Sequence, residues 1–173
     1  MRPIWAIRIL AITGVLALAF TTATADEGAT SFSTSMSGFQ ETPPILTNGS
    51  GVFHATVNGN SMTYTETFNG LTTNVTQSHI HFGERGVLGS IFVFLCTNLG
   101  NGPAGTPACP AAGGTVTGTV TAASVIGVAG QNISAGDFAA LLRILRSGDA
   151  YVNVHTVRFP AGEIRGQVRA AED

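Results

Sequence analysis

Hydrophobic and polar residues alternate along much of the chain with a period of two, which is typical of β-strands. Residues 51–57 and 61–68 show the clearest alternation, and Asn58-Gly59 between them is a strong signal for a tight β-hairpin. Residues 90–96 are apolar without alternation, as expected for a strand that is covered on both faces. Further strands are predicted in three segments, residues 115–125, 150–157 and 162–170.

Residues 134–147 have the period of an α-helix instead. Ser134 and Asp137 stand at the spacing of a capping box, and Gly148 follows the last turn. Four apolar residues recur at helical spacing and would form the buried face: Phe138, Leu141, Leu142 and Leu145. This is the one substantial helix that the sequence predicts. The expected fold class is all-β, an immunoglobulin-like or Greek-key β-sandwich or barrel with one short capping α-helix.

The first residues have the pattern of a secretory signal peptide. Arg2 and Arg8 precede an apolar stretch, residues 9–20, which is followed by the small residues Ala23-Thr24-Ala25. The apolar stretch is shorter than the roughly 20 residues of a membrane-spanning helix, and no other stretch approaches that length. The sequence therefore predicts an exported protein without a membrane span after signal cleavage.

Cleavage near Ala25 and Asp26 would remove residues 1–25 and leave residues 26–173 as a single β domain. The expected location is secreted or periplasmic. The chain has no lysine, and the mature part would carry six arginines against ten acidic residues. A negative surface disfavours nucleic acid and anionic membranes as partners. The expected partner is an extracellular or periplasmic one that the sequence does not specify.

Cys96 and Cys109 are the only cysteines of the chain. In an exported protein an isolated cysteine pair predicts a disulfide bond rather than a metal or catalytic site. The bond would close a loop rich in glycine and proline, and the loop-entropy model assigns roughly 3 kcal/mol to a ring of this size.

Four stretches, in this order, resemble bacterial exported proteins with a CHRD (chordin-type) domain: SMSGFQETPP (35–44), SHIHFGERGVLGSIFVFLC (78–96), SAGDFAALLRILRSGDAYVNVHT (134–156) and FPAGEIRGQV (159–168). The resemblance covers about residues 30 to 169. It implies an all-β, immunoglobulin-like sandwich or barrel that works outside the cytoplasm, and it implies no particular enzymatic activity.

The pattern of three histidines is similar to part of the copper site of copper/zinc superoxide dismutase. His79 and His81 stand one residue apart on a predicted strand, and His155 follows near the end of the chain. Because alternate strand residues share a face, both histidines project together while Ile80 packs behind them. Three such imidazoles could hold one copper or zinc ion. If they converge, we expect their nitrogens within roughly 5 Å of one another even without metal.

The pattern departs from the dismutase because no histidine lies between residues 82 and 154, so the zinc subsite is absent. A second interpretation is a structural polar layer, in which the histidines hydrogen-bond to backbone carbonyls or to carboxylates such as Glu84 and Glu163. A third, acid–base catalysis, has the least support because no residue stands in a recognisable nucleophile context. No catalytic residue is therefore assigned.

The same polar layer is expected to include further charged residues. Glu163 and Arg165 share a strand face and would fix the C-terminal strand, and Glu41 would lie at a strand end before two prolines. Two functional classes stay open. The leading one is a non-enzymatic binding or scaffolding module outside the cytoplasm, and the alternative is a copper- or zinc-binding protein with redox activity.

Overall fold

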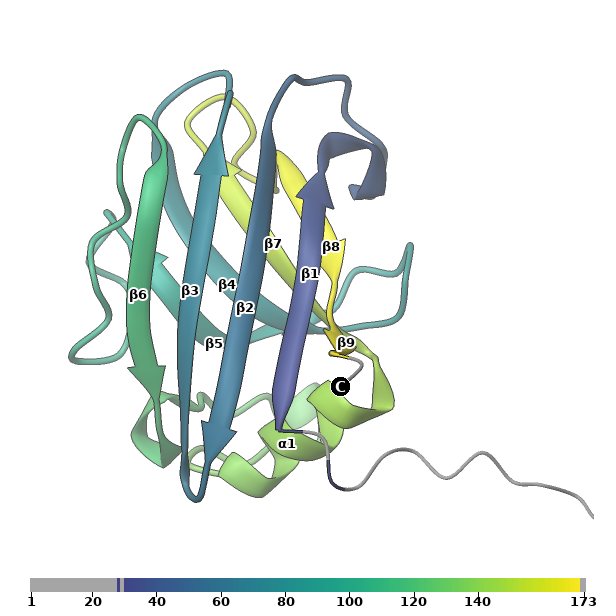
Figure 1. Cartoon of the computed structure of the whole chain (residues 1–173), viewed down its shortest axis with the longest axis vertical. Coiled ribbons are helices and arrows are strands. Elements are labelled where there is room, and N and C mark those ends of the chain that lie inside the picture. Colours follow the sequence, from purple (N-terminus) through teal and green to yellow (C-terminus); the bar gives the residue numbers. More distant parts are fainter. Residues whose placement is uncertain (1–27, 29, 172–173) are drawn as a thin grey trace, which may run out of the picture.

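The computed structural model describes residues 28 and 30–171, so the predicted signal peptide lies outside the described residues. In this part of the chain nine antiparallel strands form one sheet that curls into a nearly closed barrel (Figure 1). The strands are β1 (Ser31–Ser37), β2 (Ser50–Asn58), β3 (Ser61–Asn69), β4 (Val75–Phe82), β5 (Ser90–Thr97), β6 (Gly114–Val120), β7 (Ala150–Thr156), β8 (Ile164–Gln167) and β9 (Arg169–Ala170). The predicted all-β class is confirmed.

The strand order is β5-β4-β7-β8-β1-β2-β3-β6, and β9 pairs with β1. Figure 1 shows β1, β2, β3 and β6 as one wall of the barrel and β4, β5, β7 and β8 as the other. Strand β7 returns beside β4 after the chain has passed through β5 and β6, which is a Greek-key connection. The end strands β5 and β6 approach each other, and the hydroxyl of Tyr64 on β3 donates to the carbonyl of Leu95 on β5. The Greek-key connection places distant parts of the sequence on the neighbouring strands β4 and β7.

The alternating pattern of the sequence explains the barrel interior. In β2 every second side chain is buried, and β2 pairs with β3 along its whole length, from Ser50 opposite Asn69 to Asn58 opposite Ser61. Gly59 in the connecting turn has φ 57°, in the left-handed region that a tight hairpin requires. The interior is filled by apolar side chains from both walls, which include Phe32, Phe53, Met62, Phe68, Ile80 and Phe92.

One α-helix, α1 (Phe138–Ser147), lies across one end of the barrel (Figure 1). It begins four residues later than predicted, because Gly136 has φ 82° and cannot belong to a right-handed helix. Asp137 is the N-cap, and its carboxylate accepts a hydrogen bond from the Ala140 N–H at 2.8 Å. The capping box expected from Ser134 is therefore wrong.

The buried face of α1 also differs from the prediction in one residue. The face is centred on Leu141, so Ile144 is buried and Leu142 lies at its margin, only partly buried. The other described helices are short 3₁₀ turns: η1 (Gly38–Gln40), η2 (Ala122–Ser124) and η3 (Ala129–Gln131). Among the described residues no helix has the length and apolar character needed to cross a membrane.

Two predicted strands are shorter than the sequence pattern indicates. The strand predicted over 115–125 ends as β6 at Val120, because Thr121 and Ser124 cap η2 through their own side chains. The strand predicted over 162–170 is divided into β8 and β9. Val168 interrupts it, and its N–H donates to Ala150 on β7 instead.

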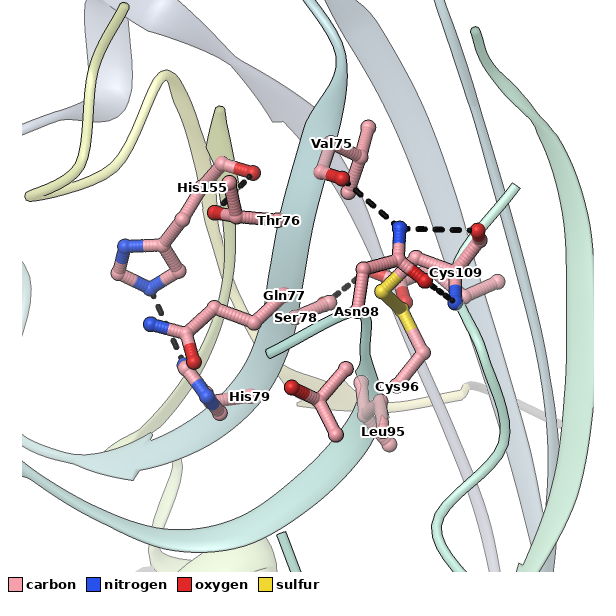
Figure 2. The surroundings of a disulfide bond; sticks show 12 residues. Val75, Thr76, Gln77, Ser78, His79, Leu95, Cys96, Asn98, Cys109 and His155 are labelled. Carbon is pink, nitrogen blue, oxygen red and sulfur yellow. Dashed lines mark hydrogen bonds between the residues drawn. A yellow bond between two sulfur atoms is a disulfide. The ribbon is translucent and has the colours of Figure 1, made fainter. Parts of the chain in front are cut away.

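The predicted disulfide is confirmed: Cys96 and Cys109 are joined at an S–S distance of 2.06 Å. The disulfide ties the loop after β5, which carries Cys109, back to β5, which carries Cys96 (Figure 2). Within that loop the side chain of Asn98 hydrogen-bonds to Val75 and to the backbone of Cys109. The disulfide and Asn98 together order a segment that has no strand or helix of its own.

Candidate three-histidine metal site

The structure brings His79, His81 and His155 together on the outer face of the barrel wall. His79 and His81 alternate with Ile80, which packs inside the barrel, and His155 lies on the adjacent strand β7. One ligand nitrogen of each ring lies within 4.8 Å of the others. The rings are almost entirely covered, with exposed fractions of 0, 7 and 5% respectively. Among the described residues, these three histidines form the group of side chains that could share one metal ion.

Each histidine has a hydrogen-bond partner at Nδ1, and His155 has a second one at Nε2. His81 Nδ1 lies 3.0 Å from the carbonyl oxygen of Gly89, and His155 Nδ1 lies 3.0 Å from that of Pro160. His79 Nδ1 lies 3.1 Å from His155 Nε2, a contact that is visible in Figure 2. The Nε2 atoms of His79 and His81 are buried and have no hydrogen-bond partner.

These contacts fix the tautomers of the three neutral rings. A carbonyl oxygen only accepts, so Nδ1 of His81 and of His155 must carry the proton. The Nε2 atom of His155 is then an acceptor, and His79 Nδ1 donates to it. The remaining nitrogens, Nε2 of His79 and Nε2 of His81, are lone pairs that point into protein without a donor. Such buried unpaired acceptors are rare in folded proteins.

The rings are neutral near pH 7 because burial lowers their pKa values. Burial, with smaller contributions from His155 and His81, lowers the pKa of His79 to about 2. Burial also lowers the pKa of His81 to about 4, although its hydrogen bond to Gly89 acts in the opposite direction. The pKa of His155 is lowered for the same reason. Neutral imidazole is the form that binds metal ions.

The donor set fits copper or zinc. Two nitrogens bound at about 2.0–2.1 Å to one tetrahedral ion lie roughly 3.3 Å apart. The observed 3.1 Å between His79 Nδ1 and His155 Nε2 is close to that separation. The carbonyls of Gly89 and Pro160 accept from Nδ1 of His81 and His155, and such hydrogen bonds commonly orient histidines that bind a metal through the other nitrogen.

Aromatic rings flank the cluster on two sides. The edge of Phe94 meets His79 at a centroid distance of 4.4 Å, and Tyr151 stacks on His81 at 4.6 Å with an interplanar angle of 8°. The Tyr151 hydroxyl accepts from the Gly89 N–H and donates to the Gly89 carbonyl, the same carbonyl that His81 contacts. Tyr151 therefore supports His81 both directly and through Gly89.

Arg165 lies beyond Tyr151, since β7 runs between β4 and β8. Its Cζ is 3.4 Å from the centroid of the Tyr151 ring, and Nη2 donates to the Glu84 carbonyl at 2.8 Å. A weaker contact of 3.4 Å joins Nη1 to the Thr42 hydroxyl. The guanidinium is thus held in place among three chain segments, and the side chain is 2% exposed.

Glu41 belongs to the same outer layer. Its carboxylate accepts a hydrogen bond from Asn153 Nδ2, which also donates to the Ile164 carbonyl at 3.1 Å. Burial raises the pKa of Glu41 to about 7, and the hydrogen bond from Asn153 and the charge of Arg165 offset part of that rise.

Neither of the carboxylates proposed as histidine partners contacts a histidine. Glu84 is exposed. Its backbone carbonyl, and not its carboxylate, accepts a hydrogen bond from Arg165. Glu163 accepts hydrogen bonds from Thr47, Thr72 and Thr156 at 2.7–2.9 Å. Burial would raise its pKa, but these hydrogen bonds outweigh burial and hold the pKa below its usual value. Glu163 connects loops and does not orient the histidines.

Sequence reasoning missed the supporting residues of the site. The alternation of β7 places Tyr151 on the same face as His155, but nothing local indicates that its ring stacks on His81. The carbonyls of Gly89 and Pro160 come from loops. Every residue has a backbone carbonyl, so the residue type does not indicate which carbonyl will bind a histidine.

Comparison with known proteins adds one finding to this geometry. No curated protein and no solved structure matches the chain. The family model of the CHRD domain matches residues 32–168, from the second residue of β1 to the residue that follows β8. The protein therefore belongs to the CHRD domain family.

Proposed function

We propose that this protein is an exported, non-enzymatic binding module that holds one copper or zinc ion at His79, His81 and His155. CHRD domains are typically extracellular binding modules, and a disulfide bond is typical of proteins that work in oxidising compartments. The proposal adds to this general role a metal ion as the ligand.

The observation that carries the proposal is the buried acceptor Nε2 of His81, which has no donor, beside the close approach of His79 Nδ1 and His155 Nε2 at 3.1 Å. A buried acceptor without a donor costs about 1–3 kcal/mol. A hydrophobic side chain at position 81 would avoid this cost, whereas a metal ion would use the lone pair of His81. The arrangement is therefore better explained by ligand binding than by stability.

Each histidine would have a defined part in the site. His81 and His155 would offer Nε2, because the opposite nitrogen of each ring donates to a carbonyl. His79 would offer Nδ1, which faces His155, once its proton has moved to Nε2. The ion would supply the positive charge and the coordination bonds that replace the contact between His79 and His155.

A binding or scaffolding role without metal is the second candidate. It is favoured by large apolar side chains on exposed loops, where Leu46 and Leu88 are 87% and 71% exposed. Where such side chains form a contiguous patch, they mark contact surfaces with other proteins.

Thermal unfolding of the purified mature protein with increasing copper or zinc tests the proposal. We expect the melting temperature to rise, because a ligand at a hundred times its Kd stabilises the folded state by about 2.7 kcal/mol. His81→Ala should abolish the rise. His54→Ala is the matched control, since His54 is an exposed histidine on β2, away from the cluster.

Two results would contradict a metal site: no rise with either metal in the wild type, or a rise that His81→Ala leaves unchanged. Export is tested separately by N-terminal sequencing of protein recovered from outside the cytoplasm. The expected first residue is Asp26.

A further inference from the structure

We infer that the three-histidine site selects Cu(I) over Zn(II) and Cu(II), and that Arg165 is the residue that sets this preference across the ring of Tyr151. The inference rests on the proposed metal-binding function and concerns the charge of the ion. It follows from three features of the site: the charge of its ligands, the fixed cation beside it, and the chemistry of the surfaces that flank it.

The first feature is that the ligands are uncharged. All three are imidazoles, and among the described residues no carboxylate hydrogen-bonds to any of the rings. Glu163 is engaged by threonines, and Glu41 by Asn153. A metal ion would therefore keep its full charge in a covered position. In the Born description the cost of burial grows with the square of the charge, so a divalent ion costs about four times as much as a monovalent one.

The second feature is the cation at Arg165. The Tyr151 ring separates its guanidinium from His81, stacking on His81 on one side and contacting Arg165 on the other. The hydrogen bond to Glu84 and the covered position keep the guanidinium from turning away into solvent. An arginine stays protonated in proteins. Its repulsion of a divalent ion is twice its repulsion of a monovalent ion at the same place.

The third feature is that hydrocarbon surfaces flank the cluster on two sides. Zn(II) with three protein ligands usually takes a water as the fourth, and Cu(II) prefers tetragonal coordination by nitrogen and oxygen. The cluster is flanked by the edge of Phe94 and by the face of Tyr151, and the Tyr151 hydroxyl is engaged with Gly89. Cu(I) is stable at a low coordination number. Three imidazoles between hydrocarbon surfaces therefore suit Cu(I) better than they suit Zn(II) or Cu(II).

The test compares the affinities of the three ions for the purified mature protein. Cu(I) is measured under anaerobic conditions against a chromophoric Cu(I) chelator, and Zn(II) and Cu(II) against chelators of known affinity. We expect Cu(I) to bind more tightly than Zn(II). Arg165→Gln, which removes the charge and keeps a hydrogen-bonding side chain, should lower the ratio of Cu(I) to Zn(II) affinity by about tenfold or more.

Two further variants separate charge from structure. Arg165→Lys keeps the cation and should retain most of the selectivity. Arg143→Gln makes the same change in net charge on the exposed side of α1 and should leave the ratio unchanged. A spectroelectrochemical titration of bound copper provides an independent measurement, because loss of the cation should lower the reduction potential of the site. If Arg165→Gln fails to fold, the wild-type affinities still decide the preference.

The outcomes distinguish this inference from the proposed function. Absence of metal binding, or binding that persists in His81→Ala, overturns the metal site itself. Binding that depends on His81 but is tighter for Zn(II) or Cu(II) than for Cu(I) overturns only the inferred preference. A ratio that is equal in Arg165→Gln and wild type overturns the role of Arg165.

Discussion

Asn98 joins the disulfide loop to the barrel through both polar atoms of its side chain. Its Nδ2 donates to the carbonyls of Val75 and Cys109 at 2.9 and 3.1 Å, and its Oδ1 accepts from the Cys109 N–H at 3.0 Å (Figure 2). The loop has no strand of its own, and among the described residues only two backbone hydrogen bonds join it to β4: Val75 N–H to the Ala111 carbonyl and Asn98 N–H to the Thr76 carbonyl. A single amide side chain therefore does what a strand would do elsewhere in the sheet.

We expect Asn98→Ala to lower the free energy of unfolding by about 1–3 kcal/mol, because it leaves backbone groups of Val75 and Cys109 unpaired. Urea unfolding of the oxidised protein measures the change. Asn48→Ala is the control, since Asn48 is exposed and should change stability by less than about 0.5 kcal/mol. Equal stability of the two variants would contradict the role given to Asn98.

Glu66 is a residue whose buried position decides its protonation state. It is completely buried among the inward-facing side chains of β3, and Oε1 accepts a hydrogen bond from the Ser78 hydroxyl at 2.7 Å. Burial raises its pKa to about 8, and the Ser78 hydrogen bond only partly offsets this rise. The carboxyl group is therefore protonated at neutral pH. The period of the strand places Glu66 inward, yet residue type alone indicates a surface position.

Among the elements, the hairpin of β2 and β3 could be predicted closely, whereas the ends of β6 and β8 and the start of the helix could not. The period of two in residues 51–57 and 61–68 specifies the hairpin, because a shift by one residue would expose the whole apolar face. An aspartate three residues after a serine fits two arrangements, a capping box or a cap of its own. The backbone of Gly136 decides between them, and its conformation depends on the loop around it.

The helix cap yields a paired prediction. Asp137→Ala should destabilise the protein by about 1 kcal/mol, because the N–H of Ala140 loses its acceptor. Ser134→Ala should have little effect, since the side chain of Ser134 is exposed. Thermal unfolding of both variants measures the difference. A larger loss in Ser134→Ala than in Asp137→Ala would show that the helix begins where the sequence pattern indicated.

The histidine cluster shows where sequence reasoning ends at the element scale. The alternation of β4 is enough to place His79 and His81 on one face. Their meeting with His155 depends on β7 returning beside β4, a pairing between strands more than 60 residues apart in the chain. That pairing is a property of the barrel topology, which the local pattern does not contain. The similarity to a known histidine pattern was needed to include His155.

For the whole molecule, buried ionisable groups act on stability in two opposite directions. The histidines have lowered pKa values, so the stability they contribute is complete above their ordinary pKa of 6.5 and is lost as the pH falls toward 4. Glu41 and Glu66 have pKa values raised to about 7 and 8. Their contribution is complete below their ordinary pKa of 4.5 and is lost as the pH rises through these values.

The metal-free protein should therefore be most stable at a pH of about 6 to 7, with the free energy of unfolding falling on both sides. On the acid side the three histidines outweigh the two glutamates, because the unfolded chain takes up more protons than the folded one. On the alkaline side Glu66 continues to lose its proton up to about pH 8. Urea unfolding between pH 5 and 9 with a chelator present measures the profile.

Glu66→Gln separates the two sides of that profile. Glutamine has the shape of the protonated carboxyl group and does not titrate, so the variant should lose the decline between pH 7 and 8 and keep the decline below pH 6. Glu84→Gln is the control, because Glu84 is exposed and should leave the profile unchanged. If the alkaline decline persists in Glu66→Gln, another group must cause it. A fall in stability that begins only below pH 4 would instead show that burial does not lower the pKa values of the three histidines.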